Sequence, residues 1–189
     1  MVMPNRFTAV LDANVLYGGL HRHIALSLAQ ADLYRPAWSS EILDEFERNL
    51  AKRIPAKKAK RQLELIKLSF PDSEVVVRAA LIAQIDLDDL DDRHVVAAAI
   101  QTQAALIVTD NLKHFPKDIL AEFDTVAVSA DQFFSDCITV SELTAVSQIR
   151  KMRGQFDSPK FDAKGLLLRM EQVGLSQTAD VLSKYADLI

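Results

Sequence analysis

The chain has 189 residues, of which 49% are hydrophobic and 25% are charged, as is typical of a globular protein with one main domain. Its formal net charge of −4 argues against indiscriminate binding to nucleic acid. Cys137 is the only cysteine, the longest wholly apolar stretch covers residues 95–100, and the first six residues lack the apolar region of a signal peptide, so we expect a cytoplasmic protein with neither disulfide nor membrane span.

The first half of the chain alternates between strand and helix patterns. An apolar, β-branched run at residues 7–11 predicts a buried strand, and the residues after it fit a helix. The elements expected next are a helix at 24–33, an extended piece at 34–38, a helix from Ser39 or Ser40 through Leu50, a basic helix between Pro55 and Pro71, a strand at 73–77 and a helix at 79–85.

The second half begins with the same alternation and ends in helices alone. Asp91 or Asp92 is expected to cap a helix through Gln103. The elements expected after it are strands at 104–109 and 125–128, a helix from Asp131 to about Ile138, and helices at 141–153, at 162–173 with Gly174 as C-cap, and at 176–185. The prediction is an α/β domain at residues 1–138 and a small helical extension at 139–189.

Acidic and polar side chains follow two of the predicted strands. Asp12 comes directly after the first strand, and Thr109, Asp110 and Asn111 end a later one. Ligands of α/β sheets bind at the carboxyl ends of the strands, so Asp12 is a candidate metal ligand. An Asp in this place also commonly caps the next helix, with Asn14 sharing that role. Thr109 could orient a carboxylate or a water through its hydroxyl, and the alternative for this segment is an Asp-Asn turn.

Further acids lie at the margins of predicted helices. Asp89, Asp91 and Asp92 precede a helix whose dipole favours one negative charge at its N-terminus. Three carboxylates this close repel one another unless cations neutralise them, and oxygen ligands suit Mg²⁺ or Mn²⁺. Glu45 lies at the edge of the apolar stripe of its helix and faces either a cleft or solvent. The alternative for the three aspartates is a solvated acidic loop.

A run of basic residues precedes these acids in the chain. Six cations fall within ten residues, namely Lys52, Arg53, Lys57, Lys58, Lys60 and Arg61. A basic edge beside an acidic cleft is one way to hold a phosphate backbone over metal ions, so Lys57, Lys58, Lys60 and Arg61 are candidate substrate-binding residues. The alternative is a solvated helix face.

Other chemistries find little support in the sequence. The five glycines form no phosphate-binding loop, and Cys137 has no motif around it. The four histidines, His21, His23, His94 and His114, lack the HExxH pattern or the cysteine partners of a zinc site.

Four segments in order resemble the PIN-domain nucleases, and specifically the VapC-like toxins of type II toxin-antitoxin pairs. They are Leu11-Asp-Ala-Asn-Val-Leu16, Ser40-Glu-Ile-Leu-Asp-Glu-Phe-Glu-Arg-Asn-Leu50, Asp89-Leu-Asp-Asp-Arg-His-Val-Val-Ala-Ala-Ala99 and Ile107-Val-Thr-Asp-Asn-Leu-Lys-His-Phe-Pro116. The resemblance covers about residues 5–136. It implies a three-layer sandwich with a short parallel sheet between helices, and acids that bind Mg²⁺ or Mn²⁺ to activate water for RNA hydrolysis.

The resemblance also assigns roles to individual residues. Carried over by position, Asp12, Glu45 and Asp92 match the core catalytic acids, Asp12 and Asp92 are metal ligands, and Asp89 is an additional ligand. The family's fourth acid follows the threonine by two residues, and here Asn111 holds that place. Asn14 and Thr109 are expected near the substrate. Family membership further implies a cognate antitoxin protein and, commonly, a homodimer.

Two other functions compete with a toxin ribonuclease. The first is a non-catalytic PIN module that binds RNA or a protein partner, in which Asn111 marks a lost metal site. The second is a phosphotransferase of the haloacid dehalogenase type, which also begins with an Asp after a first strand. Such enzymes need a second Asp two residues later, where this chain has Asn14.

Overall fold

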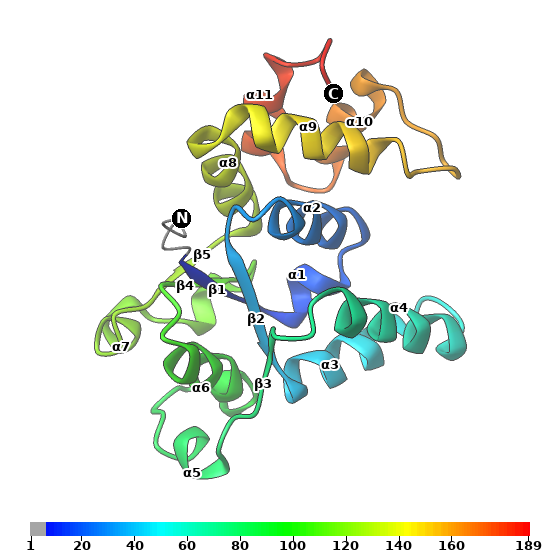
Figure 1. The fold of residues 1–189 in the computed structure, drawn as a ribbon. Helices are drawn as coiled ribbons and strands as arrows, with labels where there is room; N and C mark the ends of the chain where they lie inside the picture. The colour runs from blue at the N-terminus through cyan, green and yellow to red at the C-terminus, as the bar shows by residue number, and fades with distance from the viewer. Residues whose placement is uncertain (1–6) are drawn as a thin grey trace. The chain divides into compact units, whose positions relative to one another are not determined.

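The computed structural model describes residues 7–189 and divides into two compact units. The first, which we call the sheet unit, holds the described residues up to Gly18 together with Arg35–Val128. The second, the helical unit, holds Gly19–Tyr34 and Ser129–Ile189. Figure 1 traces both along the chain.

The sheet unit is built on five parallel strands. Their order across the sheet is β3-β2-β1-β4-β5, with bounds β1 Thr8–Leu11, β2 Arg35–Ser39, β3 Glu74–Val75, β4 Leu106–Val108 and β5 Val126–Val128. The helices of this unit are α1 Ala13–Tyr17, α3 Ser40–Leu50, α4 Ala56–Ser69, α5 Ala79–Ile82, α6 Arg93–Thr102 and α7 Lys117–Ala121, with short 3₁₀ turns η1 Leu90–Asp92 and η2 Leu112–His114.

The register of the central strands decides which residues meet at the carboxyl edge of the sheet. Ala9, Val10 and Leu11 of β1 are fully buried, as expected of a strand covered on both faces. Leu11 pairs with Val108 of β4. The chain extends this pairing by one bond, because the Asp12 amide donates to the Val108 carbonyl at 3.1 Å. The residues directly after β1 and β4, Asp12 and Thr109, are thus brought side by side.

The capping hydrogen bond at the start of α3 comes from a predicted residue, whereas the one before α6 comes from a residue that was not predicted. Ser39 is the N-cap of α3, and its hydroxyl accepts from the Ile42 amide at 3.3 Å, as predicted. At the start of α6, Asp92 holds the N-cap position without a side-chain capping bond. The capping carboxylate is that of Asp89, which accepts from the Asp91 amide at 3.0 Å and opens η1. Asp92 thus takes the predicted N-cap position of α6, but the side-chain capping bond in this segment comes from Asp89 and belongs to η1.

The helical unit packs one early helix with the helices of the C-terminal part. Its elements are α2 Gly19–Gln30, α8 Ala130–Val140, α9 Glu142–Arg153, α10 Ala163–Gln172 and α11 Ser176–Ser183. The rings of Tyr34 and Phe133 meet edge to face at 4.8 Å, and the Tyr34 hydroxyl donates to the Ala25 carbonyl. Burial of aromatic rings in this geometry is a main source of core stability.

Asp131 has a role that its position in the sequence does not reveal. Ser129, and not Asp131, is the N-cap of α8. The Asp131 carboxylate accepts hydrogen bonds from the amides of Gln177 and Thr178 at 2.9 and 2.8 Å. It therefore caps α11, forty-six residues away in the chain, and fastens that helix to α8.

The predicted α/β fold, with a short parallel sheet flanked by helices, is confirmed, and so is the helical character of the C-terminal part. The strand expected at 73–77 shrinks to Glu74–Val75, and α7 was not predicted. The boundary expected between residues 138 and 139 stays a prediction. Within residues 7–189, no helix combines the length and apolar character needed to cross a bilayer.

Candidate metal centre and nucleic-acid interface

Asp12 is held at the end of β1 by two neutral side chains. Its Oδ2 atom accepts from the Thr109 hydroxyl at 2.7 Å and from the Asn14 amide at 2.6 Å. Asn14 also donates to the Thr109 hydroxyl oxygen at 2.9 Å, which closes a triangle of three side chains. The Asp12 side chain makes no capping bond to α1. Asp12 therefore holds the N-cap position of α1, while its carboxylate is engaged by Thr109 and Asn14.

Burial leaves the Asp12 carboxylate in an unfavourable electrostatic environment. Only 4% of Asp12 is exposed, and Thr109 is completely buried. Burial raises the pKa of Asp12, and the negative charge of Asp92 adds to this rise, whereas the hydrogen bond from Thr109 opposes it. A nearby cation would offset the cost of burying the Asp12 charge, because it would favour the ionised carboxylate.

A second cluster gathers around His114 in η2. The His114 Nδ1 atom is 2.6 Å from Oδ2 of Asp92, 3.0 Å from Oδ2 of Asp89 and 2.8 Å from Nδ2 of Asn111. The Asn111 backbone amide donates to the Thr109 hydroxyl at 3.1 Å. A continuous chain of hydrogen bonds thus links this cluster, which we call the histidine cluster, to Asp12.

The donor set of the histidine cluster fits a divalent cation. One ligand atom each from Asp89, Asp92 and His114 lies within 4.8 Å of the others. Carboxylate oxygens are the usual ligands of Mg²⁺ and Mn²⁺, and an imidazole nitrogen suits transition ions. Asp89 and Asp92 would hold such an ion, and the charge of Asp92 acts on Asp12.

Glu45 and His94 line a groove beside these acids. The groove has a volume of about 470 Å³ and is bounded by Glu41, Asp44, Glu45, Arg48, Asp91, Asp92 and His94. Burial raises the pKa of Glu45, and the charge of Asp12 raises it further, so Glu45 lies within electrostatic reach of Asp12. Burial lowers the pKa of His94, against the opposing effect of Glu45 and Glu41. Glu45 therefore faces a cleft rather than open solvent.

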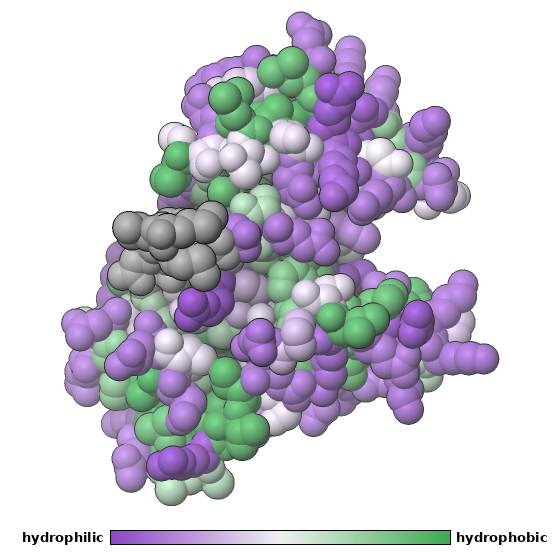
Figure 2. Space-filling model, in the orientation of Figure 1, coloured by the Kyte–Doolittle hydropathy of each residue, from purple (hydrophilic) through white to green (hydrophobic). Residues whose placement is uncertain are grey.

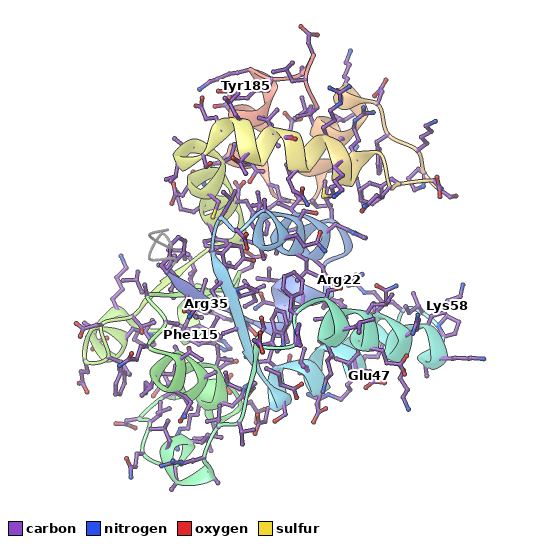
Figure 3. The ribbon with its side chains drawn as sticks, in the orientation of Figure 1. Arg22, Arg35, Glu47, Lys58, Phe115 and Tyr185 are labelled. Carbon is purple, nitrogen blue, oxygen red and sulfur yellow. The ribbon has the colours of Figure 1, made fainter. Side chains whose placement is uncertain are left out.

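The basic run lies on and before α4 and is largely exposed. Lys58, labelled in Figure 3, and its neighbours Lys57 and Lys60 are exposed at the start of α4, whereas Arg61 pairs with Glu64 on the same helix at 3.3 Å. The Arg53 guanidinium sits 4.2 Å from the centre of the Tyr17 ring. Figure 2 shows a hydrophobic patch over α4, where Leu65 and Leu68 are exposed.

The structure brings most of the predicted site residues together. Asp12, Asn14 and Thr109 form one network, and Asp89, Asp92 and Asn111 meet in the histidine cluster. Asp110 is exposed, and its amide donates to Oδ1 of Asn14. Sequence reasoning missed His114 and His94, because no zinc motif surrounds them. Their position three residues beyond Asn111 and two beyond Asp92 was the available signal.

Comparison with known families decides what this arrangement is. The PIN domain family matches residues 8–113, more than half of the chain, and this range includes every acid of the site. The chain belongs to the PIN domain family. The match ends at residue 113, so His114 and the helical unit's C-terminal helices lie outside it.

A curated relative supports the same assignment. The chain is 40% identical over 76 residues to the protein named "Putative ribonuclease VapC50" of Mycobacterium tuberculosis (strain ATCC 25618 / H37Rv). The aligned segment covers 40% of this PIN-domain chain and 45% of the relative, so the chain spans about half the length of the relative that it matches. The comparison with solved structures found no match.

Proposed function

We propose that this PIN domain is a divalent-metal-dependent endoribonuclease that acts as the toxin of a toxin-antitoxin pair. The observation that carries the proposal is the convergence of Asp12, Glu45 and Asp92 from three separate segments. In addition to burial, the charge of Asp92 raises the pKa of Asp12, and the charges of Asp12 and Asp92 raise the pKa of Glu45. Carboxylates so placed repel one another unless a cation lies among them. The name of the relative, a ribonuclease, supports RNA as the substrate.

In this proposal, each group of side chains in the site has a separate role in hydrolysis. Asp12, Asp92 and Asp89 would hold Mg²⁺ or Mn²⁺, which when bound lowers the pKa of water and offsets charge on the phosphate. Thr109 and Asn14 fix the orientation of the Asp12 carboxylate. Glu45, with its raised pKa, is suited to take a proton from the attacking water. Lys57, Lys58, Lys60 and Arg61 would hold the RNA backbone.

The toxin role implies a protein partner. Its cognate antitoxin would cover the groove lined by Glu45, Asp92 and His94, which is mostly acidic and therefore suited to a basic side chain. The homodimer implied by the resemblance, and the cytoplasmic location expected from the sequence, remain predictions.

Substitution of Asp12 tests the proposal directly. Asp12→Asn should abolish RNA cleavage and the growth arrest caused by expression, because one lost carboxylate removes a metal ligand and charge at the reacting phosphate. Cleavage of total RNA with end mapping gives the readout, and circular dichroism checks the fold. Unchanged cleavage in a folded Asp12→Asn protein would refute the assignment.

Asn111 favours a second candidate, a non-catalytic PIN module that binds RNA or protein. Its neutral amide stands where the family has an acid, and it lies 2.8 Å from His114 within the cluster. Calorimetric titration with Mg²⁺ and Mn²⁺ separates the two functions. A nuclease should show saturable binding of Mg²⁺ or Mn²⁺ in this titration. A module that has lost its metal site should bind neither ion.

A further inference from the structure

His114 lies where several polar groups meet, and the reaction described above does not use it. Its Nδ1 atom has the carboxylates of Asp92 and Asp89 on one side and the amide nitrogen of Asn111 on the other. An imidazole nitrogen carries either a proton or a lone pair. It therefore cannot donate to the carboxylates and accept from the Asn111 amide at the same time. With the Asn111 amide in this orientation, hydrogen bonds alone do not satisfy all three partners of the nitrogen.

A divalent cation satisfies the same groups together. Metal–ligand bonds of roughly 2.0 to 2.4 Å place two ligands of one ion within about 4.8 Å of each other, and the ligand atoms of Asp89, Asp92 and His114 lie within 4.8 Å. The His114 side chain is 26% exposed, so an ion from solvent can reach it. A half turn of the Asn111 amide exchanges its nitrogen for an oxygen of nearly the same shape.

We propose that His114 supplies its Nδ1 lone pair to the divalent ion held by Asp89 and Asp92, and that this ligand makes the site prefer a first-row transition ion over Mg²⁺. The inference rests on the proposed function, because it assigns a specificity-determining residue to the same metal site. Mg²⁺ takes oxygen ligands and retains its waters, whereas imidazole binds transition ions more strongly. The imidazole adds a donor atom, though no negative charge, to a site in which Asn111 stands where the family has an acid.

Calorimetry with two ions gives the first test. Wild-type protein and the variants His114→Ala and His94→Ala are each titrated with Mg²⁺ and with Mn²⁺. His94 is the matched control, because it is also a histidine beside Asp92 but lies outside the three-ligand cluster. We expect wild type to favour Mn²⁺, His114→Ala to reduce the ratio of the two affinities about tenfold, and His94→Ala to retain the ratio.

A measurement on the wild-type protein removes any dependence on the folding of a variant. Paramagnetic Mn²⁺, added below one equivalent, should broaden the imidazole ¹H–¹⁵N signals of His114 before those of His21 and His23. RNA cleavage is measured in the same samples.

The outcomes separate this inference from the proposed function. An equal affinity ratio in wild type and His114→Ala, or a His114 signal that broadens no earlier than His21 and His23, overturns the inference while metal-dependent cleavage still stands. If wild type binds neither ion, the inference and the proposed function both fail.

Discussion

The end of β1 and the start of α6 hold their carboxylates in different ways. Asp12 is almost fully buried and receives its hydrogen bonds from the neutral side chains of Asn14 and Thr109. The side chains of Asp92 and Asp89 are 17% and 40% exposed and share a histidine supplied by a loop turn. The sheet register fixes the first arrangement, whereas side chains on turns create the second. Changes at the β1 end should therefore have larger effects than changes in the histidine cluster.

After the loss of cleavage expected for Asp12→Asn, Thr109→Val is expected to have the largest effect among the changes that test this difference. The substitution keeps the shape of the side chain and removes the hydroxyl that joins Asp12, Asn14 and Asn111. A buried carboxylate that loses a donor costs about 1 to 3 kcal/mol. We expect RNA cleavage to fall at least tenfold and thermal unfolding to occur at lower temperature.

Thr125→Val is the matched control. Thr125 is also buried in the sheet unit, but its hydroxyl donates to the Ala104 carbonyl at 2.8 Å, away from the acids. It should lower the unfolding temperature without changing cleavage per folded molecule. If both variants lose cleavage in proportion to stability, the Thr109 hydroxyl has no specific effect on Asp12.

The basic run of α4 extends the comparison to substrate binding. Replacement of Lys57, Lys58, Lys60 and Arg61 by Gln removes four charges without touching either carboxylate cluster. Lysine-rich contacts to phosphates give affinity that depends on salt, so the apparent KM should rise about tenfold and its dependence on salt should flatten. Cleavage assays across a salt series measure both. A salt dependence equal to that of wild type would assign the run to a solvated face.

Asn111→Asp sharpens the comparison inside the histidine cluster. An added carboxylate beside Asp92 and His114 should tighten Mg²⁺ binding several-fold, because hard cations favour charged oxygen ligands. Asp110→Asn should change little, since Asp110 is exposed and contributes its backbone amide to Asn14. Calorimetry and the metal concentration for half-maximal cleavage report on both variants. If Asp110→Asn weakens Mg²⁺ binding and Asn111→Asp leaves it unchanged, Asp110 holds the fourth acid position.

The smallest expected effect concerns the stability of the metal-free protein. The pKa of Asp12 is raised by burial, so the folded state binds its proton more tightly than the unfolded chain. Stability in chelator should therefore fall as the pH rises from about 3.8, the ordinary pKa of an aspartate, through the raised pKa of Asp12 in the folded state. Asp12→Asn should remove this contribution and raise the unfolding temperature at neutral pH by about 2 to 4 °C.

Thermal melts in chelator at acidic and neutral pH test the sign of this effect. Asp136→Asn, on the exposed face of α8, is the control for loss of one negative charge. A lower unfolding temperature for Asp12→Asn at neutral pH would mean that the hydrogen bonds from Thr109 and Asn14 outweigh the cost of burying the charge.

Local patterns predicted the parts of the site that the sheet creates. The apolar run before Asp12 marked a buried strand, and the register of β1 and β4 then placed Asp12 beside Thr109. The apolar stripe of α3 predicted Glu45 at its margin, and Glu45 lines the groove in the structure. His114 could not be predicted in the same way, because its two carboxylate partners lie 22 residues or more away in the chain and a 3₁₀ turn brings it to them.

Capping was predicted only where it is local. Ser39 accepts from the amide three residues further on, a spacing that the sequence displays. Asp131 instead serves a helix that begins more than forty residues later, which no local pattern indicates. For the basic run the sequence indicated two alternatives, because charge patterning does not distinguish a phosphate-binding face from a solvated one.

The division of the chain between its two units has a consequence for synthesis. Helix α2 packs against α8 and α9, which the ribosome makes only after all five strands. Since an N-terminal segment emerges first, α2 must wait for its partners while the sheet unit is completed. A ribosome paused after Val128 would carry every candidate metal ligand from Asp12 to His114, yet α2 would still lack the helices against which it packs.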